Sequence, residues 1–285
     1  MSEPGVASGA PVRDGGAVKA VILARGLGTR MRRADAETAL DPAQAAVAET
    51  GVKGMIPVGR PFLDYALSAL ADAGFREACL VIGPEHDAVR EYYTRTVTPR
   101  RLRIDFAIQE RPLGTADAVL AAESFAGGQP FLVVNSDNYY PVPTLAAVRV
   151  LRAPALPGFD RDALVRDGNV SPERIRSYAL LVVAPDGSLR RVIEKPDDAT
   201  LRALGDTPLV SMNCWLLSPD IFDACRRIAP SARGELELPH AVQWLIDERG
   251  ARFTVLPARA PVLDLSSRSD IPEVAARLAG VEVAL

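Results

Sequence analysis

The sequence predicts an α/β protein with a Rossmann-like three-layer αβα architecture and a mostly parallel, mixed sheet. The first half of the chain alternates short apolar runs with amphipathic helical patterns, and this order is typical of parallel strands connected by helices. The second half contains a hairpin pattern, so part of the sheet is expected to be antiparallel. We expect residues 18–285 to form a single domain, preceded by a flexible tail of small residues, glycine and proline at positions 1–17.

Four strands and four helices are expected in the first half. The run "AVKAVILA" at 17–24 is apolar except for one lysine, as in a strand that is covered on both faces. In the segment 60–74, apolar residues at positions 62, 63, 66, 67 and 70 follow the spacing of a helix face, and Gly74 is expected to end that helix. The other strands are expected at 77–83, 102–108 and 130–135, and the other helices at 40–51, 84–93 and 115–125.

The second half is expected to contribute antiparallel strands as well as helices. Two extended runs flank the turn sequence Pro185-Asp186-Gly187, and this arrangement predicts a hairpin over 178–196. The segment 159–176 combines mixed charge with turn residues and is expected to be a surface excursion. The remaining expectations are a strand near 208–217, helices at 218–227 and 236–248, a strand at 252–257 and a closing helix from 269.

Composition and charge argue against several classes of protein. Hydrophobic residues make up 48% of the 285 residues, yet no run of 18 apolar residues predicts a membrane-spanning helix, and the N-terminus lacks the pattern of a signal peptide. The net charge of −3 argues against a broad nucleic-acid-binding face, so an anionic ligand would need a local cationic cluster. The three cysteines lie far apart in apolar surroundings, and we therefore expect a reduced cytoplasmic protein without nucleic-acid or membrane partners.

Polar and glycine-rich motifs follow three of the expected parallel strands. These motifs are "RGLGTR" at 25–30, "QERPLGT" at 109–115 and "NSDN" at 135–138. Ligands of such sheets bind beyond the carboxyl ends of the strands, where the motifs are expected to meet. Gly26 and Gly28 allow backbone N–H groups to approach phosphate oxygens, with positive charge close by in the same motif. Taken alone, each motif is equally explained by an ordinary turn or helix cap.

The ordered set of motifs is more specific than any single one. "VILARGLGTRMR", "VKGMIPVGRPFLDYALSAL", "QERPLGTADAVL", "FLVVNSDNYY", "YALLVVAPDGSLRRVIEKP", "RGELELPHAVQWL" and "VLDLSSRSDI" follow one another along the chain. This series resembles the sugar-1-phosphate nucleotidyltransferases, or nucleotide-sugar pyrophosphorylases, from about residue 18 to 280 and without a β-helix extension. The resemblance implies that 18–285 is a nucleotidyltransferase domain with a role in nucleotide-sugar biosynthesis or secondary metabolism.

The resemblance also implies an activity and its machinery. A nucleoside monophosphate would pass from a nucleoside triphosphate to a sugar 1-phosphate or a sugar-like cyclitol 1-phosphate, giving an NDP-sugar or NDP-cyclitol and pyrophosphate by in-line attack. The residues implied in catalysis are Arg30, at the β- and γ-phosphates, Lys53, at the α-phosphate or the incoming phosphate, and Asp137. Asp137 and Asp264 would hold the Mg²⁺ cofactor.

The same comparison implies two binding sets. The nucleotide side would consist of Leu23, Ala24, Arg25, Gly26, Gly28, Thr29, Arg30, Gln109, Gly114 and Thr115. The acceptor side would consist of Asn138, Ala179, Glu194, Lys195 and Asn213. Among the departures from the family pattern, Arg25 stands where alanine or glycine is usual and Ala179 replaces a frequent glycine.

Several alternatives stay open at the level of sequence. A non-catalytic relative that binds nucleotide or sugar phosphate, as a sensor or subunit, would share the fold. A nicotinamide-dependent oxidoreductase is disfavoured, because the glycine loop lacks a third glycine and the expected second strand ends in "VIG", with no acidic residue at its end to hold ribose. The base, the acceptor, the role of the inserted segment 34–51 and the state of any homo-oligomer are not determined by the sequence.

Overall fold

The computed structural model describes residues 16–33, 38–194, 196–197 and 208–285. The tail expected at 1–17 therefore lies outside the described residues, apart from its last two positions. Ala17 at the end of that tail packs against the core of the domain. Among the described helices, none has the length and apolar character needed to cross a membrane.

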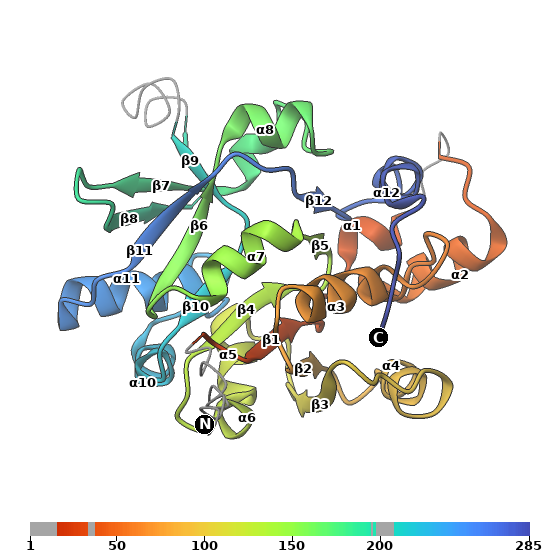
Figure 1. The fold of residues 1–285 in the computed structure, drawn as a ribbon, viewed down its shortest axis with the longest axis horizontal. Helices are drawn as coiled ribbons and strands as arrows, with labels where there is room; N and C mark the ends of the chain where they lie inside the picture. Colours follow the sequence, from red (N-terminus) through yellow and green to blue (C-terminus); the bar gives the residue numbers. More distant parts are fainter. Residues whose placement is uncertain (1–15, 34–37, 195, 198–207) are drawn as a thin grey trace, which may run out of the picture.

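One mixed sheet organises the described residues, in the strand order β3-β2-β1-β4-β10-β6-β9-β7-β8, with β11 paired to β6. β1 lies between β2 and β4, and its residue Leu23 stands opposite both Val81 and Asn135. The carboxyl ends of these strands consequently meet at one edge of the sheet, as the sequence predicts (Figure 1). The parallel strands are β1 (Lys19–Leu23), β2 (Glu77–Ile82), β3 (Arg103–Ile108) and β4 (Phe131–Asn135).

The second half of the chain extends the sheet with antiparallel strands. The predicted hairpin is confirmed as β7 (Ala179–Val183) and β8 (Leu189–Ile193). The strand expected near 208–217 is present but interrupted. It forms β9 (Leu209–Ser211) and β10 (Trp215–Leu217), which both pair antiparallel with β6. Asn213, which has a φ of 56°, lies in the interruption between them.

Two further strands complete the large sheet. β6 (Ala155–Phe159) pairs in parallel with β11 (Thr254–Ala258), which confirms the strand expected at 252–257. β6 was not predicted, because its sequence "ALPGF" contains proline and glycine, the residues that usually interrupt strands.

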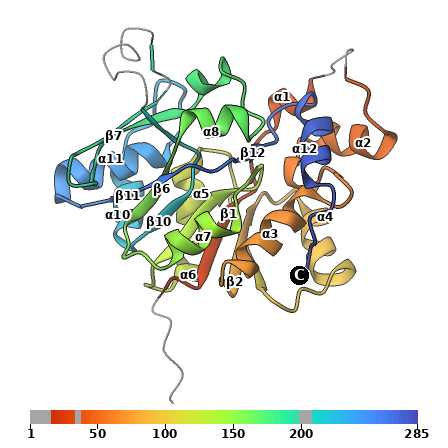
Figure 2. The same ribbon diagram turned by 45° about the horizontal axis from the view of Figure 1, so that its top comes forward.

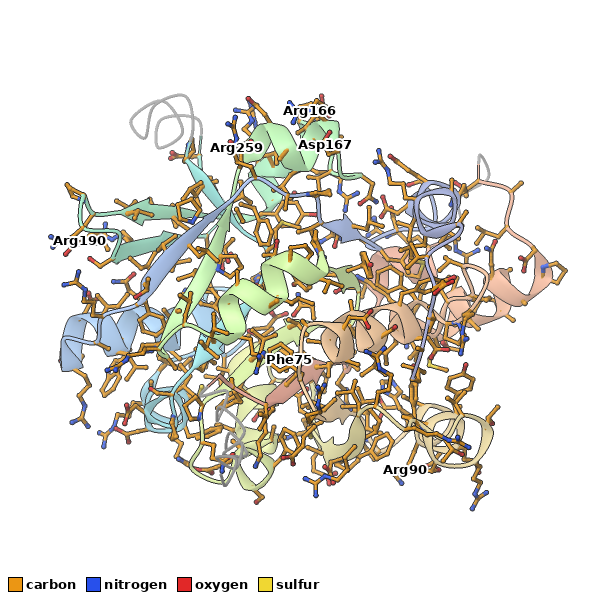
Figure 3. The ribbon with its side chains drawn as sticks, in the orientation of Figure 1. Phe75, Arg90, Arg166, Asp167, Arg190 and Arg259 are labelled. Atoms are coloured by element: carbon orange, nitrogen blue, oxygen red, sulfur yellow. The ribbon has the colours of Figure 1, made fainter. Side chains whose placement is uncertain are left out.

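Helices cover both faces of the sheet, and the expected three-layer architecture is confirmed (Figures 1 and 2). Alternate residues of β1 belong to the hydrophobic cores on opposite faces of the sheet. Ala20 and Ile22 pack with α3 and α7, whereas Val21 packs with α5, α10 and α11. Phe75 lies fully buried near the centre, while Arg90, Arg166 and Arg190 lie at the periphery (Figure 3). The helices are α1 (Thr29–Arg32), α2 (Pro42–Thr50), α3 (Phe62–Asp72), α4 (Asp87–Glu91), α5 (Thr115–Ala121), α6 (Glu123–Ala126), α7 (Val142–Arg149), α8 (Arg161–Arg166), α10 (Asp220–Arg227), α11 (Leu238–Arg249) and α12 (Asp270–Leu278).

Two helical regions differ from the sequence-based expectation. The helix expected at 84–93 is confined to α4, and a π-helical turn at Tyr92–Thr96 follows it. The excursion expected at 159–176 contains the short helix α8, which begins where Asp160 accepts a hydrogen bond from the Ala163 backbone N–H at 2.9 Å.

A second, two-stranded sheet connects the end of the chain to the edge where the parallel strands end. β5 (Asn138–Tyr139) pairs with β12 (Leu263–Asp264), so that Asp264 stands opposite Asn138. Beyond β12, α12 packs against α1 and α2 in a third hydrophobic cluster, and both ribbon views place these helices together (Figures 1 and 2). The C-terminal segment therefore supports the loop that follows β1.

Candidate active site

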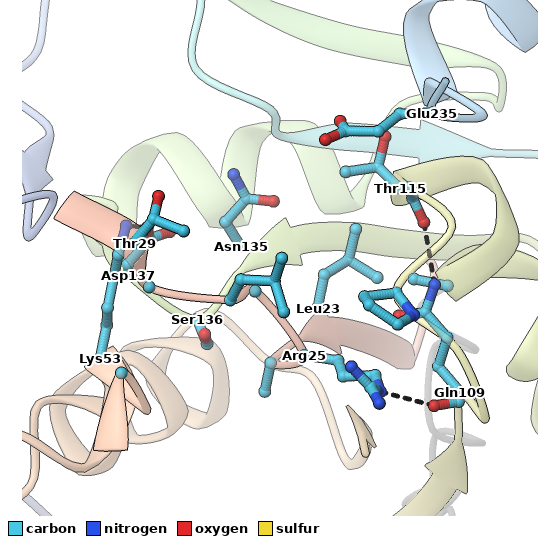
Figure 4. A pocket seen from close by; sticks show the side chains of 18 of the residues that line it. Leu23, Arg25, Thr29, Lys53, Gln109, Thr115, Asn135, Ser136, Asp137 and Glu235 are labelled. Carbon is cyan, nitrogen blue, oxygen red and sulfur yellow. Dashed lines mark hydrogen bonds and ion pairs between the residues drawn. The ribbon is translucent and has the colours of Figure 1, made fainter. Parts of the chain in front are cut away.

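A pocket of about 380 Å³ opens at the carboxyl ends of β1, β3 and β4. Every residue predicted for the nucleotide side lines it, and Lys53 and Asp137 line it as well. Thr29, Lys53 and Asp137 lie at one end of the pocket, whereas Gln109 and Thr115 lie at the other (Figure 4). The structure therefore gathers the motifs that are widely separated in the sequence into one cavity with two distinct ends.

The glycine loop 26–28 is shaped by a close approach of two backbone segments. Gly28 has a φ of 59°, and a Cβ atom added there would lie 2.3 Å from the carbonyl oxygen of Gly51. Gly51, which ends α2 with a φ of 76°, lines the pocket together with the loop. Only glycine tolerates this combination of backbone angle and contact. The C-terminal end of the inserted helix α2 therefore packs directly against the loop.

Lys53 and Asp137 form an ion pair at the first end of the pocket. Lys53 Nζ donates a hydrogen bond to Asp137 Oδ2 at 2.8 Å, and both side chains are about four-fifths buried. Burial alone would lower the pKa of Lys53, but the charge and hydrogen bond of Asp137 outweigh it, and the net pKa is raised above 10.5. Lys53 is consequently a fixed cation at neutral pH.

Arg30 contributes a second cation at the same end. It belongs to the short helix α1, lines the pocket and is exposed. Arg30, Lys53 and Asp137 line the same pocket, and the charges of Arg30 and of the nearby Asp264 act on the pKa of Lys53 in opposite directions. Arg30 has no ion pair with another described residue, so its guanidinium is available to an anionic ligand.

Gln109 occupies the opposite end, and its amide orientation is determined by its neighbours. Gln109 Nε2 donates to the carbonyl oxygen of Gly114 at 3.0 Å and to Asp117 Oδ2 at 2.7 Å. Because both partners can only accept, the NH₂ group must face them and the Oε1 atom is left for a ligand. The pocket therefore offers a hydrogen-bond acceptor at this end.

Arg25 braces the strand ends around Gln109. Its Nε atom donates to the backbone carbonyl oxygen of Gln109 at 2.6 Å, and its guanidinium pairs with Glu85 at 3.3 Å. The departure from the usual small residue at position 25 thus ties the end of β1 to the segments that follow β2 and β3. The side chain is nearly buried and forms part of the pocket wall.

Asp264 is buried beside the pocket and does not line it. Its Oδ1 atom accepts a hydrogen bond from Asn138 Nδ2 at 2.8 Å. Its Oδ2 atom accepts from Tyr178 OH at 2.8 Å, from Ser266 Oγ at 2.6 Å and from Arg174 Nη2. Burial and the charge of Asp137 raise the pKa of the Asp264 carboxyl, and Arg174 is the largest influence in the opposite direction.

The acceptor-side residues are not gathered into the pocket. Asn138 points to Asp264, Ala179 begins β7, and Asn213 lies in the bend between β9 and β10. Glu194 is described at the end of β8 but does not line the pocket, and Lys195 lies outside the described residues. Glu235, which precedes α11, does line the pocket.

Sequence reasoning missed Arg174, Tyr178 and Asp117. The first two belong to or follow the segment expected to be a surface excursion, where mixed charge gives no periodic signal. Asp117 lies in the first turn of α5, where an acidic residue is ordinarily explained by the helix dipole. Only their contacts with Asp264 and Gln109 show that they belong to the site.

The fold and the pocket together define an α/β protein whose pocket lies beyond the carboxyl ends of parallel strands and has a cationic end. Residues 19–260 match the sequence profile of the nucleotidyl transferase family, and the chain belongs to that family. The glucose-1-phosphate thymidylyltransferase of Streptomyces griseus is 32% identical over 246 residues, which are 84% of this chain and 60% of that protein. The chain therefore spans about three-fifths of the length of this relative.

Solved structures with the same fold are more distant in sequence. A UDP-glucose pyrophosphorylase complexed with UDP-glucose has a TM-score of 0.69 at 18% identity, covering 93% of this chain and 99% of that one. The inositol-1-phosphate CTP transferase from T. maritima has a TM-score of 0.71 at 15% identity, covering 95% and 99%. These likenesses support the fold.

Proposed function

We propose that this protein transfers a nucleoside monophosphate from a nucleoside triphosphate to a sugar 1-phosphate or a sugar-like cyclitol 1-phosphate. The products would be an NDP-sugar or NDP-cyclitol and pyrophosphate. The observation that carries the proposal is the two-ended pocket, with Arg30 and the Lys53–Asp137 pair at one end and Gln109 at the other. A nucleoside triphosphate has the same polarity, with an anionic tail and a hydrogen-bonding base.

The residues at the phosphate end act by positioning and by neutralising charge. An oxygen of the acceptor phosphate attacks the α-phosphorus in line, the bond to the β-phosphate oxygen breaks, and pyrophosphate leaves with that electron pair. Arg30 holds the β- and γ-phosphates and stabilises the leaving group. Lys53 neutralises the charge that accumulates as the two phosphates approach each other.

Members of this family typically use a divalent metal, and we propose Mg²⁺. Mg²⁺ is bound by one or two carboxylates together with phosphate oxygens and water, and its charge neutralises phosphate oxygens. The described residues contain no group of three or more potential metal ligands. Asp137 nevertheless fits such an ion, because its carboxylate lines the pocket and, among the described residues, Lys53 is its one partner, at Oδ2.

The base end would bind through an acceptor atom. Gln109 Oε1 would accept a hydrogen bond from an N–H group of the base, and Gly114 would leave room for the ring. Leu23, Ala24 and Gly26 would line the path between base and phosphates. These contacts do not select one base.

The acceptor would bind beside the phosphate end. Asn138, Ala179, Glu194, Lys195 and Asn213 are proposed for it from the family pattern, and Glu235 is added because it lines the pocket. The T. maritima enzyme acts on inositol 1-phosphate, and this supports keeping cyclitol phosphates among the candidate acceptors. We expect the protein to act in the cytoplasm, with all three cysteines free and buried, and as a monomer or a homo-oligomer.

The test is pyrophosphate release with Mg²⁺. The four ribonucleoside triphosphates and dTTP are each combined with a panel of sugar and cyclitol 1-phosphates. Release that requires one triphosphate and one acceptor together would establish the activity. Tight nucleotide binding by calorimetry with no release for any pair would instead favour a binding protein that acts as a sensor or subunit.

A further inference from the structure

The two aspartates that the family pattern pairs as metal ligands lie in different surroundings. Asp137 lines the pocket and has one-fifth of its side chain exposed, and within the part of the chain that the structure describes its carboxylate is engaged at Oδ2 alone, by Lys53. Asp264 has only 5% of its side chain exposed and lies outside the pocket lining. Direct metal binding therefore requires little change at Asp137 and a large rearrangement at Asp264.

Four hydrogen bonds from the protein hold the carboxylate of Asp264, three at Oδ2 and one at Oδ1. Each carboxylate oxygen offers about two acceptor positions, so Oδ2 is fully occupied. The donors are Asn138 Nδ2, Arg174 Nη2, Tyr178 OH and Ser266 Oγ. The backbone of Asp264 is fixed as well, because the Asn169 side chain accepts from its N–H at 2.7 Å and donates to its carbonyl oxygen at 2.9 Å.

Arg174 supplies the positive charge that a metal would otherwise bring to Asp264. Its Nη2 atom pairs with Asp264, and its Nη1 atom donates to Asp270 Oδ1 at 2.7 Å. Asp270 is in turn held by the backbone N–H groups of Ser266 and Ser267, at 2.9 and 2.7 Å. The guanidinium is thus held between two carboxylates whose own positions are fixed, in the geometry that suits a charge-assisted pair.

We infer that Asp264 acts in this chain as the anchor for Arg174 and Tyr178, and that Asp137 is the carboxylate of this pair that ligates the metal. The inference rests on the proposed function, because it concerns the metal of that same site. Asp264 is then a positioning residue: it fixes Tyr178, which immediately precedes Ala179 at the start of β7. A metal bound to Oδ2 would have to displace three donors, one of them the half-buried guanidinium of Arg174.

Metal affinity, which can be measured without turnover, distinguishes this arrangement from a site in which both aspartates bind the metal. Binding of Mn²⁺ is titrated by electron paramagnetic resonance of the free ion, with the four ribonucleoside triphosphates and dTTP present in turn. Asp137→Asn is expected to weaken Mn²⁺ binding by at least about tenfold, the scale on which even supporting residues act. Asp264→Asn, which keeps the shape of the side chain, is expected to change the affinity by less than about threefold. Equal losses in the two variants would overturn the inference.

A second variant tests the same point by gain of binding. Arg174→Met removes the cation and exposes the Asp264 carboxylate, so Mn²⁺ affinity is expected to rise, and the rise is expected to vanish in the Arg174→Met/Asp264→Asn double variant. Lower affinity in Arg174→Met, with the circular dichroism spectrum of the wild type, would overturn the inference. If the wild-type protein fails to bind Mn²⁺ in the presence of every one of these nucleotides, the proposed function fails, and the inference fails with it.

Discussion

At the residue scale, the site depends on side chains that fix one another before any ligand binds. Lys53 and Asp137 are 84 positions apart in sequence and only 2.8 Å apart at their charged atoms. The motif resemblance named both residues, because each belongs to a short recognisable sequence. Arg174 and Asp117 could not be named in the same way, because their roles consist entirely of contacts with Asp264 and Gln109.

Replacing Lys53 with methionine should reduce nucleotidyl transfer by about 10² to 10³, the cost typical of losing one charge that stabilises a transition state. The substitution keeps the length of the side chain but leaves Asp137 unpaired. Steady-state measurement of pyrophosphate release gives the ratio. Lys19→Met is the matched control, because Lys19 Nζ donates only to the carbonyl oxygens of Phe125 and Ala126. Near-normal turnover in Lys53→Met would remove Lys53 from the mechanism.

Replacing Asp117 with alanine should weaken the binding of the nucleotide base at the Gln109 end of the pocket. The Gln109 amide would lose one of the two acceptors that orient it and could then turn either atom toward the base. We expect the KM for the preferred triphosphate to rise about five- to tenfold, the equivalent of one hydrogen bond, and the discrimination among bases to fall. Asp117→Asn still offers an oxygen to Gln109 and should behave like the wild type. A change in kcat alone would contradict this role.

At the element scale, the parallel strands, the hairpin and the long helices could be predicted from hydrophobic spacing and turn residues. The sequence-based predictions fail where tertiary contacts, and not the local sequence pattern, determine the structure. β9 and β10 are separated by a bend at Asn213, and β6 is a strand despite the proline and glycine in its sequence. The pairing of β5 with β12 has no local signal, because each strand has only two residues. That pairing nevertheless sets the position of Asp264.

The contact between α2 and the glycine loop can be tested at Gly51. An alanine there would be strained at a φ of 76°, at about 1–2 kcal/mol, and its Cβ would lie 2.7 Å from the carbonyl oxygen of Leu27. Gly51→Ala should therefore lower both the free energy of unfolding and the affinity for nucleotide. Gly250→Ala is the control, since Gly250 also ends a helix with positive φ, 63°, but a Cβ there would meet nothing within 4 Å. Equal effects of the two variants on nucleotide affinity would contradict the contact.

The segment after β2 should make stability depend on pH through His86. Burial lowers the pKa of His86, and its Nδ1 atom accepts a hydrogen bond from the Gly83 N–H at 3.3 Å. Because the unfolded chain then binds the proton more readily, the contribution of His86 is complete above pH 6.5 and is lost as the pH falls below that value. Urea unfolding at pH 7.5, 6.5 and 5.5 should show a smaller loss of stability in His86→Asn than in the wild type. An identical pH dependence would show that His86 does not contribute.

At the scale of the whole molecule, the fold brings three distant parts of the chain to one edge of the sheet. The loop after β1, the turn after β4 and the strand β12 converge there, although Asn138 and Asp264 are 126 positions apart. The fold class could be predicted from the alternation of strands and helices, and the gathering of the residues proposed for the nucleotide side could be predicted from motifs at the ends of parallel strands. The arrangement of the described residues proposed for the acceptor side could not, since they lie on antiparallel strands and bends whose pairing depends on the complete fold.

The most direct test of nucleotidyl transfer follows the α-phosphorus of the nucleotide. Nucleoside triphosphate labelled at the α-phosphate is incubated with the protein, Mg²⁺ and the sugar or cyclitol 1-phosphate that supports pyrophosphate release. We predict that the label appears in an NDP-sugar or NDP-cyclitol, in amounts equal to the pyrophosphate formed, and that Asp137→Asn abolishes both. Label that stays in the triphosphate, or appears as free nucleoside monophosphate, would contradict the proposed reaction.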